Sequence, residues 1–441
     1  MMPDRHKARR QRGAVLIHVA VMLTGLLAFS AFSIDHGVLM VSRGQGQNSA
    51  DAAALAAGAY LAWDDLADQA GAKAVGVAAA QQNWVWGQAP DVTPADITFP
   101  ACPPGAPGPP DTCVRADVFR NQRANGNPLP AFFSSLVGVA NQGIRATATA
   151  QVVASNNADC LKPFGIYDKW EENDGGVYVE PDPLVHSFER YEDHSTATLA
   201  EPDYYVDPWG RCPAGGVCLH QNPTGYRADM DYGTPIIIKA GNGNSGQRVS
   251  PGLYHPIVVN PDEGPGGSNY RENIATCDNY VHSIPDNAAD ATANPHLLDF
   301  EPGAMIGPTN QGISRLMAGD NAASWDPVND YPVNTCMETG SCTDPVTGEF
   351  VGISPRWIGL PLFNPDEYDF GRPSGRQTVE IVDIIGLWLE GFCGGGGGAA
   401  CPAGSGPNDV LGYITHYPSL AQGDLSGDVN ASFLRTVILV R

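Results

Sequence analysis

Two neighbouring stretches decide the fold: residues 14–34 (AVLIHVAVMLTGLLAFSAFSI) and residues 48–62 (NSADAAALAAGAYLA). The first holds no formal charge over 21 residues, and about 20 apolar residues suffice to cross a bilayer as a helix. The second is rich in Ala, the strongest helix former, and its small side chains let another helix approach closely. Gly44 and Gly46 weaken the continuity between the two and mark a candidate bend. An unbroken helix over 14–62 would be about 73 Å long.

The charges around the apolar run predict its orientation. Residues 1–13 hold five of the 25 basic side chains and one of the 48 acids. By the positive-inside rule, this basic segment stays in the cytoplasm and the bulk of the chain lies beyond the inner membrane, periplasmic or extracellular. Ala31–Ser33 offers a small-x-small site for signal peptidase, but the apolar run is longer than a usual signal sequence, so cleavage stays open.

The net charge of −23 is concentrated after residue 13, where 47 acids face 20 basic side chains. Such a body repels nucleic acid, which argues against a nucleic-acid role. The 51 Gly and 37 Pro make up about a fifth of the chain, which favours turns and short strands beyond the first hundred residues.

All ten cysteines follow residue 100, in the part predicted to be exported. An even count in an oxidising compartment favours disulfides. The rival is a zinc site, but no CxxC occurs and the ten His are scattered. Proximity in sequence predicts four pairs: Cys102 with Cys113, Cys212 with Cys218, Cys336 with Cys342 and Cys393 with Cys401. The remaining two, Cys160 and Cys277, would then pair across a long span.

The remaining pattern predicts an α+β chain in two parts. Residues 35–155 read as a helical continuation and a small α+β unit, and 156–441 as a large β-rich, disulfide-stapled domain with long loops. In the first part we expect a helix at 65–82, strands at 93–100, 114–120 and 144–153, and a short helix at 129–137. In the second part we expect strands at 235–239, 252–259, 379–389, 410–415 and 433–440.

Four features in this order resemble the TadE/TadG-like proteins of bacterial Flp (Tad) pilus assembly. They are RRQRGA (9–14), SIDHG (33–37), NSADAAALAAGAYLA (48–62) and LPAFFSSLVG…IRATATAQVV (129–153). Segments 160–170, 270–277 and 302–312 also look like the exported region of TadG-like proteins. The resemblance implies a membrane-anchored structural component of pilus biogenesis or secretion that supports surface attachment. It implies pilus-assembly or secretion proteins as partners, no enzyme activity and no cofactor.

Two positions depart from the family pattern. Pilin-like members cut by prepilin peptidase usually carry Glu five residues after the cleavage Gly, and if Gly13 is that residue, His18 stands there instead. This favours an uncut anchor. Some TadG-like proteins carry an Asp-x-Ser-x-Ser metal motif, which this chain lacks. The segment that includes Asp51, Ala53, Leu55 and Ala57 is the expected assembly helix.

Other motifs give weak chemical signals. Residues 241–246 match GxGxxG, but the sequence that follows reads as strand and turn, so a hairpin connection is preferred over a nucleotide loop. Asp424 and Asp428 stand in an acidic loop, but Val429 and Arg435 occupy the positions where an EF-hand needs Gly and Glu. Whether a calcium site exists there stays open.

The alternative function is an exported, membrane-anchored enzyme or carbohydrate-binding module. It would need a cleft of converging carboxylates and aromatics. Six aromatics are candidates for such a face, although core packing is the commoner role for such side chains in β-rich domains: Trp170, Tyr204, Tyr205, Trp209, Trp325 and Trp357.

Overall fold

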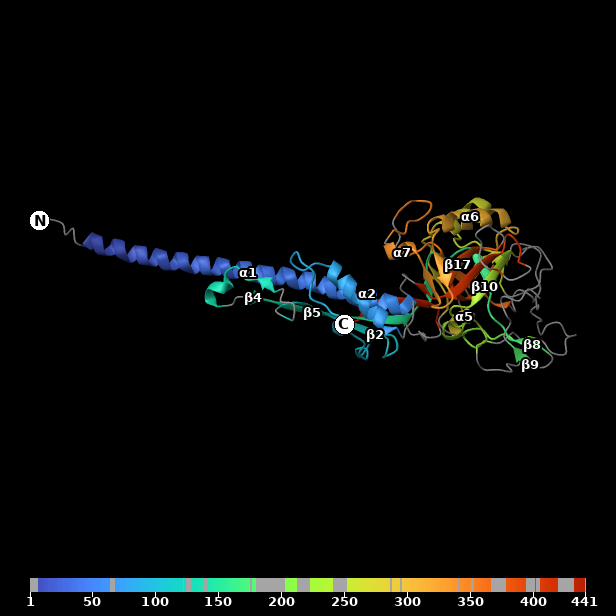
Figure 1. Ribbon diagram of the computed structural model, residues 1–441, viewed down its shortest axis with the longest axis horizontal. Coiled ribbons are helices and arrows are strands. Elements are labelled where there is room, and N and C mark those ends of the chain that lie inside the picture. The colour runs from blue at the N-terminus through green and yellow to red at the C-terminus, as the bar shows by residue number, and fades with distance from the viewer. Residues whose placement is uncertain are drawn as a thin grey trace.

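The protein, seen in a computed structural model, is an elongated stalk with a rounded head at one end (Figure 1). The structure describes residues 7–63, 68–121, 123, 128–138, 141–174, 177–179, 203–211, 223–240, 252–285, 288–293, 296–339, 341–349, 353–365, 378–393, 401, 405–418 and 432–440. We define the stalk as residues 35–154 together with strands β19 (Tyr417–Pro418) and β20 (Leu434–Val440), and the head as residues 155–416.

The axis of the molecule is helix α1 (Lys7–Trp63), 57 residues without a break and therefore about 86 Å long. It contains both stretches that the sequence analysis singled out. The helix passes through Gly44 and Gly46 without interruption. Gly46 is buried, and a Cβ there would collide with the side chain of Ile144, so this glycine serves close packing.

The stalk sheet has five strands in the order β1-β2-β5-β20-β19. Helix α1 and the shorter α2 pack against one of its faces (Figure 1). The elements of the stalk after α1 are α2 (Gln69–Gln82), η1 (Pro94–Asp96), β1 (Ile97–Thr98), β2 (Cys113–Arg120), β3 (Leu129–Pro130), η2 (Ser134–Val137), β4 (Asn141–Gln142), β5 (Ile144–Ala154), β19 (Tyr417–Pro418) and β20 (Leu434–Val440).

The head contains a closed six-stranded barrel. Its strands follow the ring β17-β16-β7-β11-β10-β18, and β18 pairs with β17 to close it, while β13 extends β17 on the outside. The ring mixes antiparallel pairs with two parallel pairs, β7–β16 and β10–β11. The barrel strands are β7 (Phe164–Tyr167), β10 (Pro235–Ala240), β11 (Leu253–Pro256), β16 (Trp357–Phe363), β17 (Thr378–Phe392) and β18 (Val410–Thr415).

Short elements surround the barrel. They are β6 (Asn157–Ala158), β8 (Glu172–Asp174), β9 (Val177–Val179), α3 (Ala228–Asp231), α4 (Gly267–Ala275), β12 (His282–Ser283), α5 (Ala288–Ala293), β13 (Leu297–Asp299), α6 (Ile306–Ala318), β14 (Ser324–Asp326), β15 (Tyr331–Val333) and α7 (Cys336–Thr339). Helices α4 and α6 contribute Ile274 and Ile313 to the same core as the barrel side chains Ile236, Leu360 and Leu387.

Several sequence expectations differ from the structure. The strand expected at 93–100 is reduced to Ile97–Thr98 after a turn of 3-10 helix, because Pro94 and the Thr93–Asp96 capping pair bend the chain there. The helix expected at 129–137 is a two-residue strand followed by the four-residue turn η2. Strand β20 was expected within the 156–441 domain, but it pairs with β5 of the stalk sheet.

Candidate functional site

The exposed half of α1 is the most unusual surface of the protein. From Val15 to Ile34 the large apolar side chains point into open space, for example Leu16 at 72% and Phe29 at 70% exposure. In the described part of the chain, α1 is the one helix long and apolar enough to cross a membrane. Because a helix that is apolar on all sides has no polar face for water, this half is suited to a lipid environment.

The exposed half ends at a single carboxylate. Asp35, one residue after the apolar run, is only 5% exposed. Its two oxygens accept hydrogen bonds from the backbone N–H groups of Phe132 (2.9 Å), Phe133 (3.0 Å) and Ser134 (2.6 Å), at the start of η2. Burial opposes the charged form of Asp35, but these hydrogen bonds outweigh it and hold the pKa of the carboxyl below its ordinary value. The carboxylate thereby fixes the η2 turn to the helix.

Beyond Asp35 the helix packs through small side chains. Ser42, Gly46, Ser49, Ala50, Ala53, Ala54, Ala57 and Gly58 form a buried face. A Cβ on Gly58 would collide with Val437 of β20, and one on Gly76 of α2 would press against Ala53 and Ala57. The expectation that the Ala-rich run lets another helix approach closely is confirmed, and the helix that approaches is α2.

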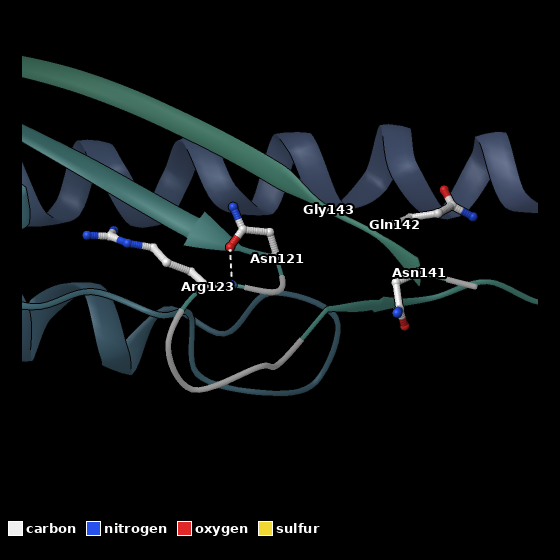
Figure 2. A pocket seen from close by; sticks show the side chains of 5 residues that line it. All are labelled: Asn121, Arg123, Asn141, Gln142 and Gly143. Carbon is white, nitrogen blue, oxygen red and sulfur yellow. Dashed lines mark hydrogen bonds between the residues drawn. The ribbon is translucent and has the colours of Figure 1, made fainter. Parts of the chain in front are cut away.

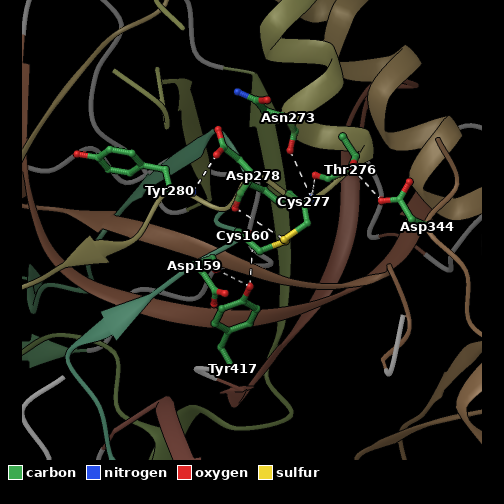
Figure 3. The surroundings of a disulfide bond; sticks show 10 residues. Asp159, Cys160, Asn273, Thr276, Cys277, Asp278, Tyr280, Asp344 and Tyr417 are labelled. Atoms are coloured by element: carbon green, nitrogen blue, oxygen red, sulfur yellow. Dashed lines mark hydrogen bonds between the residues drawn. A yellow bond between two sulfur atoms is a disulfide. The ribbon is translucent and has the colours of Figure 1, made fainter. Parts of the chain in front are cut away.

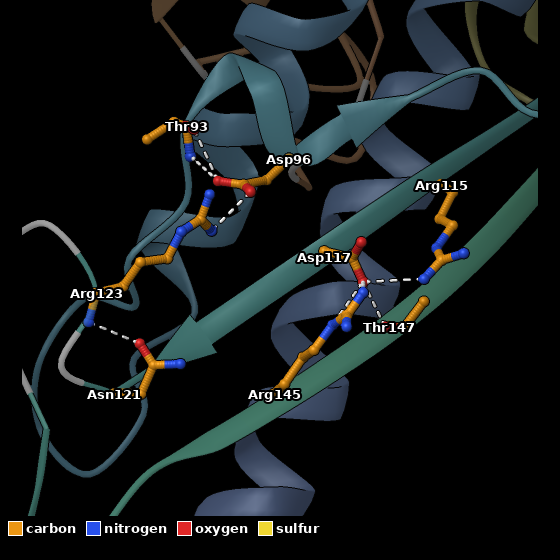
Figure 4. Close-up of polar contacts among 8 residues, drawn as sticks. All are labelled: Thr93, Asp96, Arg115, Asp117, Asn121, Arg123, Arg145 and Thr147. Carbon is orange, nitrogen blue, oxygen red and sulfur yellow. Dashed lines mark hydrogen bonds and ion pairs between the residues drawn. The ribbon is translucent and has the colours of Figure 1, made fainter.

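The outer face of the stalk sheet is polar (Figure 4). Asp117 on β2 accepts a hydrogen bond from Thr147 and forms ion pairs with Arg145 (3.0 Å) and Arg115 (3.4 Å). Burial, which would raise the pKa of Asp117, is outweighed by these neighbours, and its pKa is lowered. This face is suited to water rather than to further apolar packing.

One shallow pocket of about 470 Å³ lies beside the strand ends of the stalk sheet (Figure 2). Its lining is Asn121, Arg123, Asn141, Gln142 and Gly143. The charged group there is already engaged, because Arg123 pairs with Asp96 at 2.7 Å and stacks over Phe119. The pocket therefore presents amide groups and carries no catalytic constellation.

The stalk meets the head at an aromatic cluster. Trp63, the last residue of α1, packs with Trp325, Trp357 and Trp388 of the head. Nearby, His416 is 4% exposed, and burial together with Arg435 lowers its pKa to about 2. A neutral histidine at this place suits an apolar joint between the two parts.

Four of the five predicted disulfides are present in the described residues: Cys102–Cys113, Cys160–Cys277, Cys336–Cys342 and Cys393–Cys401. Cys160–Cys277 spans 117 residues and ties the start of the head to the end of α4 (Figure 3).

The fifth predicted disulfide differs from the other four in its outcome. Both of its residues, Cys212 and Cys218, lie outside the described residues. The pairing of Cys218 with Cys212 is therefore not among the disulfides that the structure confirms. It stays a prediction that rests on proximity in sequence alone.

The long disulfide is reinforced by a buried lysine. Lys162 donates to the carbonyl oxygens of Thr276 (2.6 Å) and Asn273 (3.3 Å) at the C-terminus of α4. Burial lowers the pKa of Lys162 to about 8. These bonds satisfy helix-terminal carbonyls that would otherwise lack partners inside the protein.

The most perturbed acids of the head are Asp168 and Asp383. Burial raises the pKa of Asp168 to about 6 although the N–H groups of Lys169 and Tyr226 and the hydroxyl of Tyr205 donate to it. Burial, with a contribution from Asp168, raises the pKa of Asp383 to about 7. Perturbed carboxyls of this kind occur both in structural networks and at reaction centres.

The residues described contain no group of three or more His, Cys, Asp or Glu arranged to hold a metal ion. The one close histidine pair among them is His282 and His296, whose ring nitrogens lie 3.1 Å apart. Burial, then His296, lowers the pKa of His282 to about 3. The loops at 241–246 and around Asp424 and Asp428 lie outside the described residues.

Comparison with known proteins gives no relative: no family model, no curated protein and no solved structure matches the chain.

The residues predicted for the assembly helix and for an aromatic face are buried or half-buried. Ala53 and Ala57 are fully buried against α2 and the sheet, and Asp51 and Leu55 are half-buried. A contribution of this helix to assembly with other proteins stays a prediction. Of the six candidate aromatics, Trp170, Tyr204, Tyr205, Trp325 and Trp357 are buried in cores, as expected for packing, while Trp209 is partly buried.

The Asp35 contact was missed by sequence reasoning, which treated Asp35 only as the first charge after the apolar run. Its partners lie 97 to 99 residues further along the chain. The isolation of one acid between an apolar helix and an Ala-rich helix is the signal that points to it.

Proposed function

We propose that this protein is a membrane-anchored structural component of Flp (Tad) pilus assembly or secretion, holding its head outside the inner membrane and supporting surface attachment. One observation carries the proposal. Helix α1 runs without a break from a fully exposed apolar half into a half that is locked in the stalk. A single rigid element then connects the bilayer to the head.

The apolar core of the barrel and the disulfides support a structural role. The described head has a closed barrel with a large apolar core, and four disulfides brace the described residues. Disulfides persist in oxidising compartments, in agreement with an exported head. The acidic head would meet its partners through polar loops, and the pilus proteins that the resemblance implies are the proposed partners.

The proposal is tested in the bacterium that encodes the chain. Deletion of the gene is expected to abolish piliation and surface attachment, and the wild-type gene is expected to restore both. A variant with Leu23→Lys and Leu26→Lys is expected not to restore them, because each lysine at the bilayer centre costs about 2.5–3.5 kcal/mol. Immunoblots of the membrane fraction separate loss of anchoring from loss of the protein. Normal piliation in the deletion strain would overturn the proposal.

A second candidate is an exported enzyme on the same anchor, favoured by the raised pKa values of Asp168 and Asp383. Two neighbouring carboxyls with raised pKa values are candidates for acid and base roles in hydrolysis. The test is turnover of glycan and peptide substrates by the full chain in detergent. Activity that Asp383→Asn abolishes, while exposed Asp262→Asn does not, would favour this candidate over a purely structural role.

A further inference from the structure

We propose that Phe132 and Phe133 form a second membrane contact, seated in the outer headgroup layer of the bilayer beside α1. This inference rests on the proposed anchoring of α1 in the membrane. Phe132 is 53% and Phe133 39% exposed. Two adjacent aromatic side chains on one short turn therefore leave much of their apolar surface uncovered by the stalk.

The position of these two rings relative to α1 is fixed. The N–H groups of Phe132, Phe133 and Ser134 all bind the carboxylate of Asp35. Asp35 follows the apolar run 14–34 directly. The aromatic turn therefore lies at the same level along the molecule as the C-terminal end of the apolar run. The position of the η2 turn beside α1 agrees with this (Figure 1).

The dimensions of a bilayer match this level. Residues 14–34 span about 31 Å, close to the hydrocarbon thickness of about 30 Å. The polar layers add about 5–8 Å on each side, and helix residues 35–41 rise through about 10 Å. Met40 at 49% and Val41 at 52% exposure show that the apolar surface of α1 continues through this second interval.

The chemistry of Asp35 agrees with a site at the membrane surface. It is the sole acid between residues 14 and 50. A carboxylate in this layer is costly unless its oxygens are hydrogen-bonded. The three backbone N–H groups satisfy them, so the same contact that offsets the cost of burying Asp35 also presents two aromatic rings to lipid. Phenylalanine is among the side chains that surface-bound segments bury at the boundary between headgroups and acyl chains.

The inference commits to lipid as the occupant, because the rings continue the lipid-facing surface of α1. The rival occupant is a protein, either a second copy or a partner. Photo-crosslinking distinguishes them. The full chain is reconstituted in phosphatidylethanolamine/phosphatidylglycerol vesicles with benzoylphenylalanine in place of one residue at a time: Phe132, Phe133, Leu26 or Val328.

Leu26 reports on the apolar run and Val328, 86% exposed in the head, reports on a surface away from the membrane. Lipid adducts are expected at Phe132 and Phe133 in a yield clearly above that at Val328, because interfacial side chains lie among the headgroups and acyl chains. If lipid adducts form at Leu26 while Phe132 and Phe133 give only background yield, the proposed second membrane contact is wrong and the anchoring of α1 stands. Background yield at Leu26 as well would overturn the anchoring itself. Protein adducts at Phe132 would assign the turn to a protein partner instead.

Asp35→Ala is the matched structural test. It removes the acceptor of the three N–H groups, so the lipid adduct at Phe132 is expected to fall several-fold while the adduct at Leu26 is unchanged. Unchanged adducts at Phe132 in this variant would show that Asp35 does not position the turn. Disulfide content and proteolysis of the head check that the variant is folded.

Discussion

In the stalk, α1 approaches the sheet and α2 through Gly46, Ala53 and Gly58, whereas in the head the core is filled by Trp388, Phe164 and long aliphatic side chains. The stalk gains stability from backbones that lie close together over a long contact. The head gains it from large buried side chains and from disulfides that close its loops. The two parts should consequently fail under opposite substitutions: enlargement damages the stalk and truncation damages the head.

The largest effect is expected for truncation in the head. Trp388→Ala removes a fully buried ring that packs against Trp357. The free energy of unfolding of the head should fall by about 3–5 kcal/mol. Thermal unfolding measured on the full chain checks this, with exposed Val328→Ala as the control. A loss equal to that of the control would contradict the assignment of Trp388 to the core.

The next effect separates the disulfides by loop length. Replacing Cys160 and Cys277 by Ser opens a link across 117 residues, whereas replacing Cys336 and Cys342 opens one across six. The chain-entropy argument predicts that opening the long link lowers the free energy of unfolding by about 2.5 kcal/mol more than opening the short one. Denaturant titration of the two double variants measures it. Equal losses would show that the long link acts on a region already ordered without it.

Enlargement should damage the stalk by a smaller amount. Ala53→Leu places a bulky side chain against α2, where Gly76 allows no room, and should cost about 1–3 kcal/mol. Ala78→Leu on the exposed side of α2 is the matched control. Limited proteolysis between residues 63 and 69 reports opening of the stalk. If both variants resist proteolysis equally, the contact between α1 and α2 has room for a larger side chain at residue 53.

A last effect, similar in size to the previous one, depends on pH. Because the pKa of Asp383 is raised from 3.8 to about 7, the folded state carries an ionisation cost that is small at pH 4, grows as the pH rises and is complete above pH 7. Asp383→Asn should raise the stability at pH 8 by roughly 1–3 kcal/mol and change it little at pH 4. Thermal melts at both pH values test this against Asp262→Asn. An equal shift at both would rule out the ionisation of Asp383 as the cause.

Helices and strands whose residue pattern is visible within a short stretch of sequence could be predicted. The apolar and Ala-rich runs predict α1, and alternating or apolar segments predict β2, β5, β10, β17 and β18 near their observed positions. Three observed disulfides followed from proximity in sequence, and Cys160–Cys277 was predicted as the pair that remained. The fifth pair, Cys212 with Cys218, stays a prediction outside the described residues. Most of these features depend on neighbours along the chain, so one sequence contains the information.

Elements that depend on distant partners were not predicted. Helix α6 contains Gly307, Pro308 and Gly312, which argue against a helix, and it is stabilised by packing of Ile313 and Leu316 in the head core. The pairing of β20 with β5 joins residues almost 300 positions apart in the chain. The Asp35 contact and the raised pKa of Asp383 likewise arise from residues that only folding brings together.

The return of β20 to the stalk has a mechanical consequence. The chain leaves the stalk through β5 and returns to it at β19, and β20 lies between these two strands, pairing with β5 over six residues. A single connection would let the head rotate about it, but two connections held in one sheet resist twisting of the head about the long axis. Tension applied to the head would pass into both strands and from them to α1, so the molecule transmits torque as well as pull from its outer end to its membrane end.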